Sequence, residues 1–167
     1  MAENHKKSQE EYERIISDLF LSIYNQKYGT DYLTGDTEDQ NSIIDRRGLS
    51  KSHKFPELKL QIKEIKKRDQ NLISDIRKEL PKKSHRGVVA FNVSIFDILK
   101  GEIFRAVDLY KDDPCVGEMT LVLVVNVSYL WMSDWIMENS NIHYLFKDIF
   151  CLALPTSNYG AYIERLQ

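Results

Sequence analysis

The sequence predicts an α/β fold in which a mixed sheet of four to five strands is flanked by helices. Three observations lead to this fold class. The 167 residues suit one domain with a sizeable core. Helical and strand-like patterns alternate along the chain. The continuously apolar stretch 119–127 is typical of a strand buried on both faces. We therefore expect a single domain over 1–167, with residues 1–8 disordered.

The N-terminal third is predicted to hold a helix followed by a β-hairpin. Apolar side chains recur at helical spacing over 8–27, and a polar loop follows at 30–40. Two strand patterns, at 42–46 and 57–65, are joined by a Gly, Ser and Lys-rich connector. In the second strand, Leu58, Leu60 and Ile62 alternate with polar residues, so one face should be apolar.

The rest of the chain is predicted to alternate between helices and strands. In order these are a helix at 69–80, a basic loop at 82–86, a strand at 88–93, a helix capped by Ser94 and Asp97, the strand at 119–127, a helical region at 130–150, and an edge strand at 159–163. Gly101 should interrupt or bend the helix that Ser94 begins.

Charge is distributed unevenly along a chain whose formal net charge is only −2. Residues 1–45 carry −6, residues 46–87 carry +9, and residues 88–167 carry −5. A basic segment within an acidic chain creates a local field that can attract a polyanion.

Several other functional classes are not supported by the sequence. The N-terminus has no apolar segment of the secretory type, and no apolar run approaches the roughly 20 residues that cross a bilayer. Cys115 and Cys151 lack zinc-ligand spacing. Nucleotide-binding glycine loops, serine-hydrolase elbows and zinc-protease helices are all absent from the sequence. We therefore expect a cytoplasmic protein without a membrane anchor.

Three residues form a candidate catalytic site: Asp45 on the first hairpin strand, with Gln61 and Lys63 on one face of the second strand. The carboxylate and amide oxygens could hold Mg²⁺ or Mn²⁺, since hard cations prefer oxygen ligands. Such a metal polarises a phosphate and activates water. Lys63, about 7 Å from Gln61 along the strand, could stabilise the charge that develops on the phosphate. The alternative is a half-buried strand whose polar face simply meets solvent.

These residues resemble the active-site hairpin of the PD-(D/E)XK, or restriction-endonuclease-like, nuclease superfamily in its Q-x-K form. The motifs are N-S-I-I-D at 41–45 and P-E-L-K-L-Q-I-K at 56–63. More narrowly, the chain is similar to the prokaryotic family catalogued as domain of unknown function 4365. Later parts of the resemblance are F-N-V-S-I-F-D-I-L at 91–99, L-V-L-V-V-N-V at 121–127, Trp135, and I-F-C-L-A-L at 149–154.

The resemblance implies a restriction-endonuclease-like core with Asp45 and Gln61 as metal ligands and Lys63 as the catalytic lysine. It also implies a helix acid, for which Glu11 is the candidate; Glu11 could instead form a capping box with Ser8. The chain departs from the family pattern because Asn41 replaces an Asp, Ile43 replaces a Gly, and Gln61 is neutral. A second register, with Glu57 and Lys59 as the E-x-K pair, remains open.

The basic segment acquires a function under this interpretation, because lysines and arginines around the hairpin could bind the phosphate backbone of DNA or RNA. The candidates are Arg46, Arg47, Lys51, Lys66, Lys67, Lys82 and Lys83. The first hypothesis is a metal-dependent nuclease from a prokaryotic defence or mobile-element context, and a homodimer is implied by resemblance. The alternative is a catalytically inactive nuclease-like module that binds nucleic acid or a protein.

Overall fold

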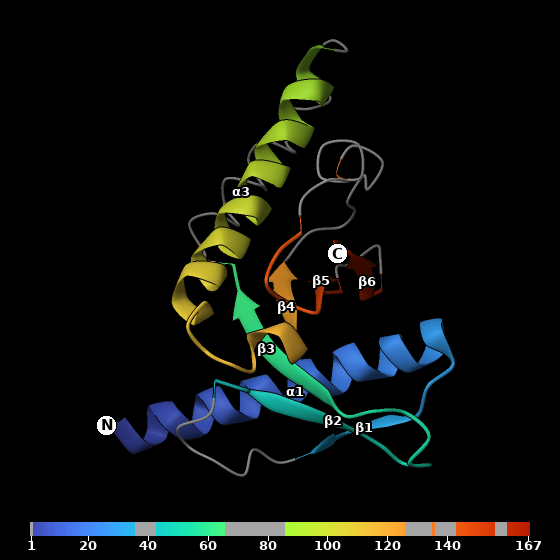
Figure 1. Cartoon of the computed structure of the whole chain (residues 1–167). Coiled ribbons are helices and arrows are strands. Elements are labelled where there is room, and N and C mark those ends of the chain that lie inside the picture. The colour runs from blue at the N-terminus through green and yellow to red at the C-terminus, as the bar shows by residue number, and fades with distance from the viewer. Residues whose placement is uncertain (1, 36–42, 66–85, 126–134, 136–142, 156–159) are drawn as a thin grey trace.

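Two long helices pack against one six-stranded sheet (Figure 1). The structure is a computed structural model that describes residues 2–35, 43–65, 86–125, 135, 143–155 and 160–167, with side chains described from residue 8 and, in the second helix, from residue 97. The elements are α1 (Ala2–Tyr28), β1 (Tyr32–Gly35), β2 (Arg46–Ser50), β3 (Leu58–Glu64), α3 (Arg86–Tyr110), the 3-10 helix η2 (Val116–Glu118), β4 (Met119–Val125), β5 (Asp148–Ala153) and β6 (Tyr162–Arg165).

The strands lie side by side in chain order, from β1 at one edge to β6 at the other. Strands β1, β2 and β3 are antiparallel, β3, β4 and β5 are parallel, and β5 and β6 are again antiparallel. The predicted mixed α/β sheet is therefore confirmed, but it has six strands in the described residues instead of the four to five expected.

Each face of the sheet is covered by its own apolar layer. On one face, Ile16 and Phe20 of α1 pack with Leu58 and Leu60 of β3. On the other, Leu99 and Ile103 of α3 pack with alternate residues of β4 and β5. Strand β4 is buried along its whole length and contributes residues to both layers, one on each of its faces. This is the burial on both faces that its apolar run predicts.

The N-terminal third differs from the prediction in three places. Helix α1 begins at Ala2, so Ser8 lies inside the helix and the predicted capping box and start were wrong. The helix ends at Tyr28, directly before Gly29, which adopts a left-handed φ of +66°. The predicted loop at 30–40 contains β1, and the first hairpin strand is β2, four residues later than expected, so Asp45 precedes it.

The C-terminal part contains further corrections. The predicted strand at 88–93 and the predicted cap at Ser94 both lie inside α3, because its apolar run continues at helical spacing into the buried residues Leu99 and Ile103. Gly101 does not interrupt that helix. Residues 148–150, predicted to be helical, begin β5, and the last edge strand is β6. The predicted helix at 69–80 lies outside the described residues.

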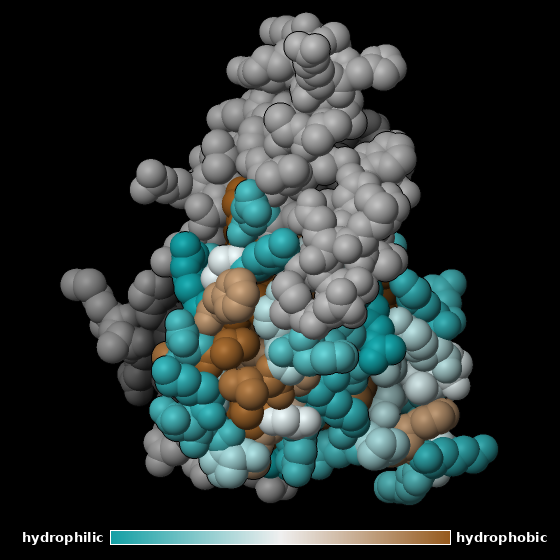
Figure 2. Space-filling model, turned by 45° about the horizontal axis from the view of Figure 1, so that its top comes forward, coloured by the Kyte–Doolittle hydropathy of each residue, from teal (hydrophilic) through white to brown (hydrophobic). Residues whose placement is uncertain are grey.

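The described surface is mainly hydrophilic, with an area of apolar residues on the face shown in Figure 2. Seven large apolar side chains are exposed: Ile15, Tyr28, Leu33, Leu49, Phe104, Leu109 and Leu145. In the described part of the chain, no helix has the length and apolar character that crossing a membrane requires.

Candidate functional site

Asp45 is fixed against β3 by three hydrogen bonds. Its backbone N–H donates to the Leu60 carbonyl at 2.9 Å. Its Oδ2 accepts two hydrogen bonds, one from Gln61 Nε2 at 2.7 Å and one from the Ile62 backbone N–H at 2.7 Å. The predicted hairpin thus brings Asp45 and Gln61 together, although Asp45 lies directly before β2 instead of within the strand.

The Asp45 carboxyl lies in an environment that disfavours its charged form. Burial raises its pKa from 3.8 to about 7; the Ile62 hydrogen bond opposes this shift, the Glu13 carboxylate adds to it, and the Arg46 guanidinium opposes it. Burial is therefore the largest influence on the pKa of this acid.

Gln61 is buried, with only 6% of its surface exposed. Its amide nitrogen faces Asp45, whereas its Oε1 is buried and has no hydrogen-bond partner among the described residues. A buried acceptor without a donor carries a desolvation cost. A hydrogen-bond donor or a water molecule would satisfy this oxygen.

Lys63 lies on the same face of β3 as Gln61, two residues further along the strand. Its side chain is partly buried. Within the described ranges no hydrogen bond or ion pair of Lys63 is found.

The helix acid that acts on Asp45 is Glu13. Glu11, the predicted candidate, is exposed on α1, and it is the Glu13 charge that contributes to the raised pKa of Asp45. Sequence periodicity cannot separate these two acids, because the choice depends on how α1 is rotated against β2 and β3.

The charge of Asp45 also acts on a tyrosine at the end of α3. Burial, and then the Asp45 charge, raise the pKa of Tyr110, the last residue of α3. The Tyr110 ring is held edge-on against Phe146, with ring centroids 6.4 Å apart. The sequence gives no signal for this electrostatic interaction, since the segment that separates Tyr110 from the hairpin is long.

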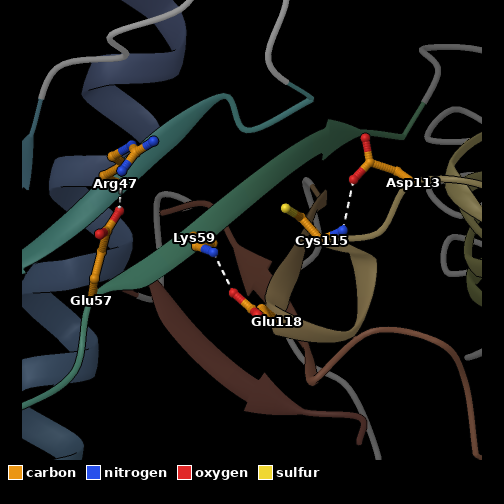
Figure 3. Close-up of polar contacts among 6 residues, drawn as sticks. All are labelled: Arg47, Glu57, Lys59, Asp113, Cys115 and Glu118. Atoms are coloured by element: carbon orange, nitrogen blue, oxygen red, sulfur yellow. Dashed lines mark hydrogen bonds and ion pairs between the residues drawn. The ribbon is translucent and has the colours of Figure 1, made fainter.

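The alternative E-x-K register is occupied by ion pairs with neighbouring elements (Figure 3). Glu57 Oε1 contacts Arg47 Nη1 at 2.8 Å, and the Lys59 ammonium contacts Glu118. Because Glu57 precedes β3 and is paired with a cation, Gln61 and Lys63 form the better candidate site.

The predicted nucleic-acid-binding residues lie in different environments. Arg46 is buried, and its Nη2 donates to the Glu10 carbonyl at 2.6 Å, which ties β2 to α1. Arg47 is paired with Glu57, and Lys51 is exposed in the turn after β2. Four of the predicted residues lie outside the described residues: Lys66, Lys67, Lys82 and Lys83.

The residues present fit a hard cation with few protein ligands. The described ranges contain no group of three or more His, Cys, Asp or Glu side chains placed to hold a metal. Asp45 offers a carboxylate, and Gln61, whose Nε2 faces Asp45, would offer its Oε1 once the amide is reversed. Such an all-oxygen pair suits Mg²⁺ or Mn²⁺, which retain several water ligands.

Searches of family models, curated proteins and solved structures found no match to this chain. The chemistry of the Asp45, Gln61 and Lys63 side chains is therefore the basis on which a function can be inferred.

Proposed function

We propose that this chain is a metal-dependent nuclease domain with a restriction-endonuclease-like core, which hydrolyses phosphodiester bonds in DNA or RNA. One observation carries the proposal: the Asp45 carboxyl, directly before β2, lies beside Gln61 of β3, and Lys63 follows on the same face of β3; among the described residues the Gln61 oxygen and the Lys63 ammonium have no partner. This combination suits the reaction because it pairs oxygen ligands for a cation with a positive charge for a phosphate. The proposal includes a cytoplasmic location, where nucleic acid and Mg²⁺ are both present.

Asp45 and Gln61 would hold the metal through oxygen atoms, which requires the Gln61 amide to present Oε1 instead of Nε2. Bound Mg²⁺ would polarise the phosphoryl group and lower the pKa of a coordinated water. Lys63 would lie beside the phosphate and stabilise negative charge on its non-bridging oxygens. Glu13 of α1 would disfavour the charged form of Asp45 until a metal is bound.

A cleavage assay tests this proposal. Wild type, Asp45→Asn and Lys63→Gln are incubated with Mg²⁺ or Mn²⁺ on single-stranded DNA, double-stranded DNA and RNA. We expect metal-dependent cleavage by wild type and a loss of about a hundredfold or more in either variant. Equal thermal unfolding of Lys63→Gln and wild type controls for folding. Wild-type protein that leaves all three substrates intact with both metals would refute the nuclease.

A catalytically inactive nucleic-acid-binding module is the second candidate, and the neutral Gln61 favours it. A site with one carboxylate holds a divalent cation weakly, because ligand charge sets much of the affinity. This candidate predicts salt-sensitive binding of nucleic acid without turnover. The cleavage assay, repeated beside a binding measurement, separates the two.

A further inference from the structure

The polar face of β3 continues past the Asp45 site into a row of cations. Arg47 of β2 lies directly opposite Lys59 of β3 in the antiparallel register. Residues opposite one another in such a pair share a face of the sheet, and residues two apart along a strand do as well. Lys59, Gln61 and Lys63 therefore lie on one face, about 7 Å apart. Positive side chains flank the candidate site on both sides.

Near Lys59 this face is partly exposed in the described part of the protein: the Arg47 and Lys59 side chains are 29% and 23% exposed. Leu33 and Leu49 pair on β1 and β2 and point to the same side as Arg47. They are 59% and 47% exposed. Helix α3 packs over β4 and β5 instead. A ligand that reaches Asp45 along β3 can thus contact Arg47 and Lys59.

Both cations are held in place by carboxylates that a phosphate could displace. Arg47 pairs with Glu57, and Lys59 pairs with Glu118 at the end of η2 (Figure 3). The Glu118 side chain is 67% exposed and the Lys59 side chain is 23% exposed. Glu118 can therefore turn into solvent when a phosphate oxygen takes its place at Lys59.

We propose that Arg47 and Lys59 form a subsite for the phosphate next to the one at Asp45 and Lys63, so that a single strand of nucleic acid lies along β3. This inference rests on the proposed function, because it extends the same site. The step of about 7 Å from Lys59 to Gln61, which lies beside Asp45, is comparable to the distance between neighbouring phosphates in an extended strand. A groove of cations that follows the backbone binds single strands without reading their sequence.

The roles of Lys59 and Glu118 distinguish this subsite from a purely structural ion pair. If the pair only stabilises the fold, removing either partner has the same consequence. If Lys59 binds phosphate and Glu118 competes with it, Lys59→Gln weakens binding and Glu118→Gln strengthens it. Both variants break the same ion pair, so a structural disturbance is common to them.

The test is binding of a fluorescent oligothymidylate to the full chain in EDTA, where metal-dependent cleavage does not occur. We expect Lys59→Gln to weaken binding about fivefold and to lower the salt slope by about 1. Glu118→Gln should strengthen binding about two- to fivefold. The matched controls are Lys27→Gln and Glu164→Gln, an ion pair at 3.5 Å that joins α1 to β6 at the other edge of the sheet. Their effects should stay below about twofold.

Cys115 gives a second readout at the subsite itself. Its partly exposed side chain lies between Lys59 and Asp113 in Figure 3, whereas Cys151 is fully buried. Alkylation of the folded protein should therefore modify Cys115 first, and saturating oligothymidylate should slow that modification several-fold. Changes of the same sign in the Lys59 and Glu118 variants, or an unprotected Cys115, would overturn the subsite. The nuclease proposal is judged separately, by cleavage with metal.

Discussion

The two faces of strand β3 differ in what they contribute to the protein. Leu58, Leu60 and Ile62 point to α1 and belong to an apolar layer. On the opposite face, Gln61 lies at Asp45 and Lys63 follows it along the strand. One strand thus supports the fold with its apolar side chains and presents polar groups with the others. Substitutions on the two faces should consequently affect different properties.

The largest expected effect on stability comes from the apolar face. Leu60 is fully buried, so Leu60→Ala removes apolar contacts and leaves a cavity. We expect it to lower the free energy of unfolding by about 3 kcal/mol, measured by urea denaturation. Lys63→Ala, on the polar face, should change it by less than about 0.5 kcal/mol. Similar losses from both variants would contradict the division between the faces.

The next effect concerns the Asp45 carboxyl in metal-free protein. Its pKa of about 7 in the folded state exceeds the ordinary 3.8, so the folded state binds more protons than the unfolded state between these values. Stability therefore falls as pH rises from about 4 to about 7 and stays low above that. Asp45→Asn does not titrate, and it should be more stable than wild type at pH 8 by on the order of 2 kcal/mol.

Urea denaturation in EDTA across this pH range measures the difference. The advantage of Asp45→Asn should shrink as pH falls and approach zero below about pH 3, where the wild-type carboxyl is protonated in both states. An advantage that is independent of pH would show that the burial of Asp45 is not what disfavours its charge.

Gln61→Glu tests the polar face of β3 by adding a carboxylate to it. A second carboxylate beside Asp45 should tighten Mn²⁺ binding about tenfold, since ligand charge raises the affinity for hard cations. Without metal the same variant should lose stability, because two buried carboxylates repel each other. Calorimetric titration with Mn²⁺ and urea denaturation in EDTA measure the two effects. Unchanged Mn²⁺ affinity would place the cation elsewhere.

The smallest expected effects come from two glycines. A methyl group on Gly48 would lie 3.1 Å from Leu21 Cδ2 and 3.2 Å from Leu58 Cβ on the α1 face. Gly48→Ala should therefore cost about 1 kcal/mol. Gly101 has open space around that position, so Gly101→Ala should stabilise α3 by about 0.5–1 kcal/mol. Thermal unfolding compares the pair, and a stabilising Gly48→Ala would contradict the close packing of β2 on α1.

The sequence predicted the parts of the fold that depend on local pattern. The spacing of apolar residues predicts the buried strand β4 and the alternation in β3. The sequence pattern of a β-hairpin predicts that Asp45 lies beside Gln61. The strand predicted at 88–93 was wrong because Val-rich runs suit a strand and a buried helix equally. Strand β1 was missed because four residues containing Thr and Gly give almost no pattern.

The features that escaped prediction depend on tertiary structure. Whether Glu11 or Glu13 acts on the charge of Asp45 depends on the rotation of α1, and the interaction of Tyr110 with that charge depends on how α3 packs over the sheet. Arg46 was expected to bind nucleic acid, yet it is buried and bonded to the Glu10 carbonyl of α1. A basic residue in a sequence does not reveal which face of the strand it occupies.

Mn²⁺-induced stabilisation of wild type and Asp45→Asn tests the central claim most directly, because it asks whether the polar face of β3 holds a hard cation. Thermal unfolding is followed with increasing Mn²⁺. The predicted result is a rise in the unfolding temperature of wild type that grows with Mn²⁺ concentration, and no rise in Asp45→Asn. Equal shifts in both proteins, or no shift in wild type, would contradict a metal site at Asp45 and Gln61.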